Sequence, residues 1–312
     1  MLYGGSCMSF SQSVRECIRN TINDQDRRFA CLYGMLLFGR TVTRGEIVLK
    51  SESDVFDSVF PILMKTVFGA AVPLEIETKP RKSGEILHIY RIRGEEAVTA
   101  IRHRFHIHEE RRIDMRNLPT NSIGTFLGGV FLTCGSITDP QKEYHMEFST
   151  PTEALCNDLC DLLLSVGVHP SKVQRRYGWS AYLKMNEEIG DLLTFIGAQR
   201  CTLELINVQV DKEVKNRINR QNNCDMANID KVISAAERQC RDIETIIAHD
   251  GMQELTPELR ELAELRMENP HLSLSDLSEM LSEPIGRSGV NHRFRRLGTI
   301  AARYRKEDGI ES

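Results

Sequence analysis

The sequence contains no apolar run long enough to cross a lipid bilayer, which takes about 20 consecutive apolar residues. The first residues also lack the apolar core of a secretory signal peptide, so Cys7 is not expected to be lipidated. Nine cysteines are present, but none form a Cys-x-x-Cys pair or a zinc-ligand set. We therefore expect a cytoplasmic protein with reduced thiols and no membrane partner.

The sequence is also poor in metal-binding and cofactor-binding patterns. The three histidines His103, His106 and His108 could in principle hold a metal, but a solvated histidine-rich connection is the better interpretation. We expect neither a metal nor a cofactor. The hydrophobic content of 41% and charged content of 27% are typical of a folded soluble chain, and 312 residues suffice for two domains of about 150 residues each.

Two glycine-containing apolar segments organise the chain. Arg28 to Val42 and Ile123 to Asp139 both predict a buried helix, and their small residues allow close helix packing. After the first segment, the pattern predicts a strand at Glu46 to Lys50, a helix at Asp54 to Phe68, strands near Leu74 to Lys79 and Ile86 to Ile92, and a helix at Glu95 to Arg104. After the second, it predicts a strand at Glu143 to Ser149, a helix at Thr152 to Val166, strands near Lys172 to Arg176 and Ser180 to Lys184, and a helix at Glu187 to Ile196.

The spacing between these two series is nearly constant. Gly34 and Gly129 are 95 residues apart, and Gly69 and Gly167 are 98 apart. Constant spacing over five successive elements indicates an internal duplication. We expect residues 28–200 to form two halves that face each other across the paired glycine helices.

The glycine helices resemble the LAGLIDADG motif of homing endonucleases, in which two such helices pack on a pseudo-twofold axis beneath a DNA-binding saddle of strands. The similarity is clearest in Leu127 to Ser136. That family places a metal-binding carboxylate at the end of each helix, where this chain has Gly39 and Cys134. Because magnesium prefers hard oxygen ligands, the resemblance implies the fold but not the nuclease activity.

Other segments are similar to the WhiA family of bacterial transcription regulators. They are Val214 to Asn223, Ser288 to Arg296, and Gly128 to Pro140 together with Tyr144 and His145. The resemblance covers nearly all of the chain from Met8 onward. It implies a degenerate LAGLIDADG domain joined to a C-terminal helix-turn-helix, acting in sporulation, cell division and chromosome segregation of a Gram-positive bacterium.

The C-terminal region predicts three short helices. Pro257 opens the first, Ser273 or Ser275 caps the second, and the third runs from Arg287 or Ser288 to about Tyr304. Between Ile285 and Lys306 there are seven Lys or Arg residues and no acid, whereas eight acids and two Arg lie between Glu254 and Glu283. A recognition helix in a major groove has this charge distribution.

The third helix therefore carries the expected DNA site. Its core stripe is predicted to be Val290, Phe294, Leu297 and Ala301. The residues expected to contact DNA are Ser288, Asn291, His292, Arg293, Arg295 and Arg296. The alternative is a solvated basic helix that binds DNA non-specifically or holds an acidic partner, as in a scaffold or nucleoid-associated protein.

Two further groups of cations are candidate DNA contacts. A polar segment from Asp211 to Asn223 places Lys215, Arg217 and Arg220 on a predicted helix, which suits phosphate contact or domain docking. The second hairpin of the duplicated domain carries Lys172, Arg175, Arg176 and Lys184. These four form a possible second DNA surface, although the saddle could equally serve a protein co-regulator.

The expected fold class is α+β: a duplicated LAGLIDADG-like domain followed by an all-α helix-turn-helix domain. We expect an N-terminal extension and lead-in helix at 1–27 and the duplicated domain at 28–210. A basic linker and long helix should follow at 211–250, and the helix-turn-helix at 251–312, after a hinge at Asp250-Gly251. Residues 1–7 are expected to be an extension that precedes the family-like sequence. The expected function is sequence-specific binding of promoter DNA at the nucleoid.

Overall fold

The protein is described by a computed structural model that covers residues 8–81 and 84–308. The chain divides into two compact units, an N-terminal unit of residues 1–212 and a C-terminal unit of residues 213–312. Residues 1–7, expected to be an extension, lie outside the described residues. Within the described ranges, no helix combines the length and the apolar character needed to cross a membrane.

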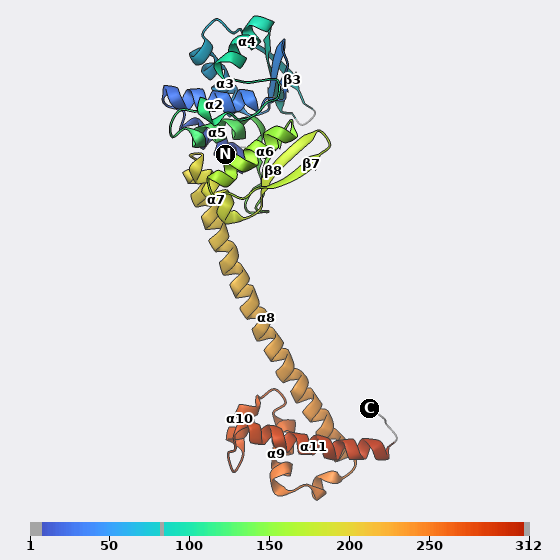
Figure 1. The fold of residues 1–312 in the computed structure, drawn as a ribbon. Helices are drawn as coiled ribbons and strands as arrows, with labels where there is room; N and C mark the ends of the chain where they lie inside the picture. Colours follow the sequence, from blue (N-terminus) through green and yellow to red (C-terminus); the bar gives the residue numbers. More distant parts are fainter. Residues whose placement is uncertain (1–7, 82–83, 309–312) are drawn as a thin grey trace, which may run out of the picture. The chain divides into compact units, whose positions relative to one another are not determined.

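The N-terminal unit is α+β (Figure 1). Its α-helices are α1 (Phe10–Arg19), α2 (Gln25–Leu37), α3 (Asp54–Phe68), α4 (Glu95–Arg104), α5 (Ile123–Cys134), α6 (Glu153–Ser165) and α7 (Asn186–Phe195). Its strands are β1 (Thr41–Val42), β2 (Glu46–Ser51), β3 (Glu75–Pro80), β4 (Ile86–Arg93), β5 (Gly135–Ile137), β6 (Met146–Thr150), β7 (Ser171–Arg175) and β8 (Gly178–Leu183). A 3-10 turn, Met115–Asn117, precedes α5.

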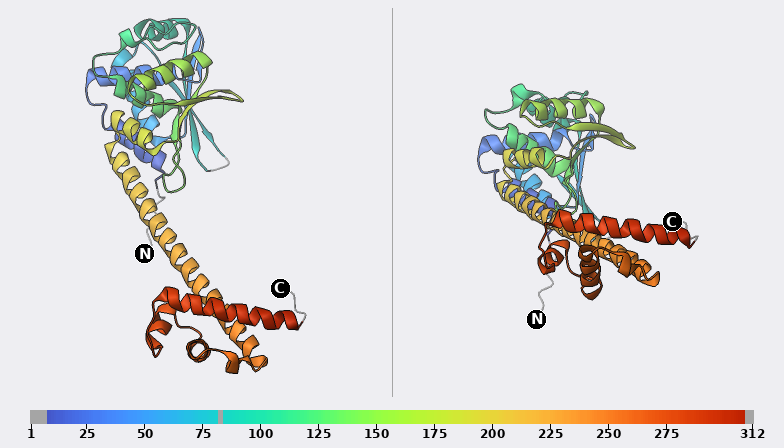
Figure 2. Two further views of the ribbon diagram at one scale, coloured as in Figure 1. Left: turned by 60° about the horizontal axis from the view of Figure 1, so that its bottom comes forward. Right: turned by 90° about the horizontal axis from the view of Figure 1, so that it is seen from below.

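The predicted duplication is visible in the sheet topology. One antiparallel sheet has the strand order β1-β2-β4-β3, and the other repeats it as β5-β6-β8-β7. The views in Figures 1 and 2 show the strands of both sheets on one side of the unit and α2 and α5 on the other. The very short strands β1 and β5, which follow the glycine helices, were not predicted, because two or three residues show no periodicity.

The glycines of α2 and α5 allow the two helices to pack backbone against backbone. A Cβ atom on Gly129 would lie 2.1 Å from the carbonyl oxygen of Cys31, and one on Gly34 would lie 2.4 Å from that of Phe126. Both distances are shorter than real Cβ contacts, so these positions require glycine. The crossing lies in the centre of the hydrophobic core of this unit, where both helices are buried.

Helix α8 runs without a break from Gln199 to Ala248, from the N-terminal unit into the C-terminal unit. The sequence predicted a helix at Asp211 to Asn223 as part of a basic linker, followed by a separate long helix within residues 211–250. The polar residues between them suggested an interruption, but they are compatible with a helix that is exposed over most of residues 209–235.

The C-terminal unit contains the last part of α8, a 3-10 turn (Gly251–Glu254), α9 (Pro257–Glu268), α10 (Leu274–Met280) and α11 (Arg287–Glu307). Its core includes Ile243 and Ile246 of α8 together with residues of α9, α10 and α11. The helix ends where Asp250-Gly251 was predicted to end it, but the predicted hinge is not a border between compact units. Gly251 is buried against the ring of Tyr304 inside the C-terminal unit.

Candidate nucleic-acid interface

The three-helix arrangement that presents α11 is held by local interactions. Ser273 caps α10 in a capping box with Asp276, so the first of the two candidate caps is the one used. The guanidinium of Arg266 is buried beneath Phe294 and donates from Nη1 to the carbonyl oxygens of Asn269, Pro270 and Leu272. These bonds fix the α9–α10 turn and therefore the position from which α11 starts.

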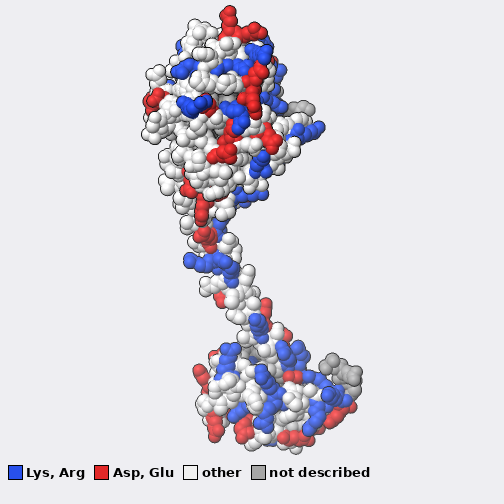
Figure 3. All heavy atoms as spheres, viewed as in Figure 1, with Lys and Arg blue, Asp and Glu red and all other residues white. Residues whose placement is uncertain are grey.

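The predicted core stripe of α11 is confirmed. Val290, Phe294, Leu297 and Ala301 are all buried. Of the predicted DNA contacts, Ser288, His292, Arg295 and Arg296 are exposed, whereas Asn291 and Arg293 are half-buried. The helix thus turns its polar residues outward over its first three turns, and in Figure 3 blue side chains spread across the visible face of this unit.

The cations of α11 differ in how they are paired. In the described part of the chain, Arg293, Arg295 and Arg296 form no ion pair, whereas Arg303 pairs with Glu254 and Arg305 with Asp242. The Arg303 pair spans 3.5 Å and the Arg305 pair 2.5 Å. The first half of the helix therefore presents arginines that no acid among the described residues holds in an ion pair, and this half enters the groove in helix-turn-helix proteins.

The predicted cations of α8 also point into solvent. Lys215, Arg217 and Arg220 are exposed, and Arg220 donates to the carbonyl of Asn216 on its own helix, at 3.3 Å. These side chains are free to contact phosphates. They belong to the same compact unit as α11.

Two of the four cations of the predicted second DNA surface are neutralised by acids. Lys172 bonds to Glu153 and Asn157 of α6 at 3.0 and 2.7 Å, so it lies on the helix-covered side of its sheet. Arg175 forms two hydrogen bonds with Glu147, at 3.1 and 3.2 Å. Only Arg176 and Lys184 lack an acidic partner among the described residues, and they lie against Tyr177 and Tyr182 respectively.

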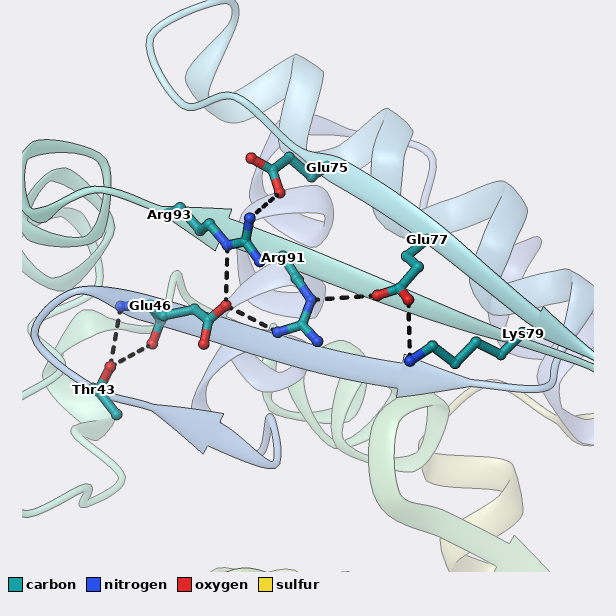
Figure 4. Close-up of polar contacts among 7 residues, drawn as sticks. All are labelled: Thr43, Glu46, Glu75, Glu77, Lys79, Arg91 and Arg93. Atoms are coloured by element: carbon teal, nitrogen blue, oxygen red, sulfur yellow. Dashed lines mark hydrogen bonds and ion pairs between the residues drawn. The ribbon is translucent and has the colours of Figure 1, made fainter.

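The first sheet carries a network of alternating charges on its outer face (Figure 4). Glu46 bonds to Arg91 and Arg93, at 2.9 and 3.3 Å, and Arg93 continues to Glu75 at 3.1 Å. Glu77 joins Arg91 to Lys79. Hydrogen bonds from Arg91 and then Arg93 hold the pKa of Glu46 below its ordinary value. Because each cation is compensated, this face offers little attraction for the phosphates of a DNA duplex.

At the helix ends where a nuclease would have its metal-binding carboxylates, two arginines donate hydrogen bonds to backbone carbonyls. Arg111 donates from Nη1 to the carbonyl oxygens of Gly39 and Leu37, at 2.6 and 3.2 Å, and Arg15 donates to that of Gly135 at 2.7 Å. The Cys134 thiol bonds to the Val130 carbonyl, and burial raises its pKa, so it stays protonated. Neither arginine was predicted from the sequence, since neither lies in or beside a glycine helix.

Comparison with known proteins extends these observations. The model of the WhiA LAGLIDADG-like domain matches residues 123–215, and that of the WhiA C-terminal helix-turn-helix (HTH) domain matches residues 218–301. A probable cell division protein WhiA of Clostridium tetani (strain Massachusetts / E88) is 34% identical over 316 residues, which cover 96% of this chain and 99% of that protein. The chain belongs to the WhiA family. A WhiA relative from Clostridium novyi (strain NT) is 45% identical over 182 residues, 58% of this chain and 57% of its own.

Solved structures agree on the fold. The crystal structure of full-length DUF199/WhiA from Thermatoga maritima superposes with a TM-score of 0.57 at 23% identity, covering 95% of this chain and 98% of that one. The N-terminal LAGLIDADG domain of DUF199/WhiA superposes at 0.51 with 21% identity, over 64% of this chain and 96% of its own. The predicted fold class is therefore confirmed: a LAGLIDADG-like α+β domain with two antiparallel sheets, followed by a helical HTH domain.

Proposed function

We propose that this WhiA-family protein is a sequence-specific DNA-binding regulator of transcription that reads promoter DNA with α11. The observation that carries the proposal is the group of arginines on the first half of α11 that form no ion pair within the described chain, of which Arg295 and Arg296 are exposed and Arg293 is half-buried. Such a helix, held by a packed three-helix core, fits the major groove.

The side chains divide by reach and chemistry. Arg295 and His292 stand on the exposed side of α11, and an arginine pairs bidentately with guanine. Ser288 and Asn291, at the start of the helix, suit base edges or the adjoining phosphates, as do Arg293 and Arg296. The α8 cations Lys215, Arg217 and Arg220 serve as phosphate contacts, which add affinity without sequence preference.

The test is selection of binding sites from a random duplex library by the purified full-length protein, followed by titration of the selected and scrambled duplexes at several salt concentrations. A regulator should bind the selected duplex about 10³-fold or more tightly than the scrambled one. Equal binding to both would instead favour the alternative, a scaffold or nucleoid-associated protein that uses the basic helix without readout.

We further propose that the LAGLIDADG-like domain has no nuclease activity. Paired carboxylates are needed to hold the cations of a two-metal cleavage site, and Gly39 and Cys134 occupy those positions. Full-length protein incubated with supercoiled plasmid and magnesium or manganese should leave it intact. Reproducible nicking that copurifies with the protein and is lost in Glu46→Ala would overturn the proposal, because Glu46 is the first acid that follows Gly39 in the sequence.

The biological process is inferred from relatives named as probable cell division proteins. We propose a role in cell division, with sporulation and chromosome segregation as the related processes in a Gram-positive host, and a location at the nucleoid. The compensated sheets of the LAGLIDADG-like domain suit a protein co-regulator better than DNA. Chromatin immunoprecipitation with sequencing should place the protein at promoters, and a uniform distribution over the chromosome would contradict a promoter-specific regulator.

A further inference from the structure

A cleft of about 670 Å³ opens in the N-terminal unit where α2 and α5 end. It lies between the two halves of the duplicated domain, within one compact unit. Its walls come from the segment after α2, from β2, from the end of α5, from the end of β6 and from the β7–β8 hairpin. Clefts of this size accommodate small organic ligands.

The charge of the cleft is positive from both sides. Arg40 and Lys50 line it from the first half, and Arg175 and Arg176 from the second, while no Asp or Glu is among its described lining residues. Of these, Arg175 is compensated by Glu147. Arg40 and Lys50 have no ion pair or hydrogen bond within residues 8–81 and 84–308, and Arg176 only stacks on Tyr177.

This pattern contrasts with the sheet faces beside it. On the first sheet, Arg91 and Arg93 form ion pairs with carboxylates, which neutralise their charge (Figure 4). Lys50 lies on the same outer face of β2 as Glu46, since the two are four residues apart on one strand, yet it has no such partner. Lys50 therefore keeps its charge available at the cleft, whereas Arg91 and Arg93 do not.

At the helix ends behind the cleft, arginines hydrogen-bond backbone carbonyls that would otherwise repel an anion. Exposed carbonyls at a helix C-terminus carry partial negative charge and would repel one. Here Arg111 donates to the carbonyl of Leu37, the last residue of α2, and to that of Gly39 just beyond it, and Arg15 donates to the carbonyl of Gly135, which follows α5. The side chains of Thr41 and Ser149, which also line the cleft, can donate further hydrogen bonds to an oxyanion.

We propose that this cleft binds a phosphate group, held by Arg40, Lys50 and Arg176 at the position of the lost metal site. Charge-assisted hydrogen bonds from Lys and Arg are the usual means of phosphate recognition. The cleft has room for a mononucleotide, and the Tyr177 ring, 78% exposed, offers an aromatic face beside Arg176 for a base. The phosphate would come from a free nucleotide or from a DNA backbone.

Isothermal titration of the full-length protein with ADP and, separately, with sodium pyrophosphate tests the site. Wild-type protein should bind both, and Arg40→Ala/Lys50→Ala should bind about tenfold more weakly for each cation removed, because a charge-assisted bond contributes roughly that factor. The matched control is Lys65→Ala, which removes an exposed cation of α3 that does not line the cleft. An unchanged circular dichroism spectrum and an unchanged thermal unfolding curve would verify that the double variant is folded.

A scrambled duplex added to the ADP complex distinguishes the two sources of phosphate. Displacement of ADP would identify the DNA backbone as a ligand of the cleft, and binding without displacement would identify a free phosphate compound. Both results support the site. It would be overturned if neither ADP nor pyrophosphate binds and duplex affinity is unchanged in the double variant, or if that variant binds ADP as wild type does. None of these outcomes depends on whether α11 reads sequence.

Discussion

Arginine has two opposite uses in this protein, and its surroundings decide which applies. Arg15, Arg111 and Arg266 are largely enclosed by the fold and donate to backbone carbonyls at helix ends and turns. Arg295 and Arg296 are exposed and unpaired within the described chain. A buried arginine substitutes for the missing solvation of a helix end or turn, whereas an exposed one keeps its donors available for DNA.

Arg295→Ala should weaken binding of the selected duplex by about 1–3 kcal/mol and relax the preference at one base pair, since it removes a contact to a base edge. Lys306, exposed and unpaired near the end of α11, provides the comparison. Lys306→Ala should lower affinity for all duplexes alike. Titration of both variants against selected and scrambled duplexes is the measurement, and an equal loss on the two duplexes for Arg295→Ala would contradict its role in readout.

His249 should make the stability of the C-terminal unit depend on pH. Its Nδ1 donates to the Thr245 carbonyl at 2.9 Å, and its Nε2 lies 3.2 Å from a carboxylate oxygen of Asp308. The Thr245 bond and then the Asp308 bond raise the pKa of the ring. The stabilisation is therefore fully present below the unfolded pKa of about 6.5 and is lost as the pH rises through the folded pKa.

Thermal unfolding followed from about pH 5.5 to about pH 8 checks this sign, because that range spans the titration of the histidine. The melting temperature of the C-terminal unit should fall with rising pH in the wild type. In His249→Gln, which keeps a polar side chain but cannot titrate, the slope should be smaller. The same slope in both proteins would show that another group is responsible.

Whole elements were predictable where hydrophobic periodicity was strong. The helices Asp54–Phe68 and Glu95–Arg104 have the predicted bounds, because apolar residues recur at helical spacing and Gly69 or Phe105 follows. Helix α8 was wrongly predicted as two helices, because its exposed middle has no apolar face in contact with a core that would reveal its continuity. The strands β1 and β5 exist only through pairing with β2 and β6, which no local pattern shows.

Two glycine-to-alanine substitutions in the N-terminal unit should have opposite effects on its stability, one at the crossing of α2 and α5 and one away from it. Gly129→Ala would place a methyl group against the Cys31 carbonyl and should lower the free energy of unfolding of the N-terminal unit by about 1–3 kcal/mol or more. Gly190→Ala, inside α7, meets only side chains at 3.6 Å or beyond. It should raise stability by about 0.5–1 kcal/mol, the ordinary preference of a helix for alanine.

Urea unfolding of the two alanine variants and the wild type is the measurement. A Gly129→Ala protein as stable as the wild type would mean that the helices can separate without cost. In that case, the close crossing would not hold the two halves together.

At the scale of the whole molecule, the sequence could not predict which cations of the candidate site form ion pairs with acids. Lys172 and Arg175 look like Arg176 in the sequence, but only the fold shows that acids from α6 and β6 neutralise the first two. Arg40 and Lys50 belong to different elements and meet the second hairpin only in three dimensions. The cations of α11 were predictable because one helix contains them all and the neighbouring segment contains the acids.

The two units have separate hydrophobic cores, so their unfolding should be separable. Phe294 lies in the C-terminal core with its ring against the guanidinium of Arg266. Phe56 lies in the N-terminal core against Phe60 and Tyr90. Phe294→Ala should cost the C-terminal unit about 3–5 kcal/mol, and Phe56→Ala should cost the N-terminal unit a similar amount. That loss is a large fraction of the stability of a small domain.

Differential scanning calorimetry of the wild type and both variants tests this independence. Two transitions are expected, and each variant should shift only one of them. The Phe294→Ala protein should lose DNA binding at a temperature at which its N-terminal unit is still folded. Helix α8 is the element that belongs to both units, and its middle is exposed, so it offers few buried contacts through which unfolding of one unit could lower the stability of the other. A single transition that both substitutions move together would show that α8 couples the two units into one cooperative structure.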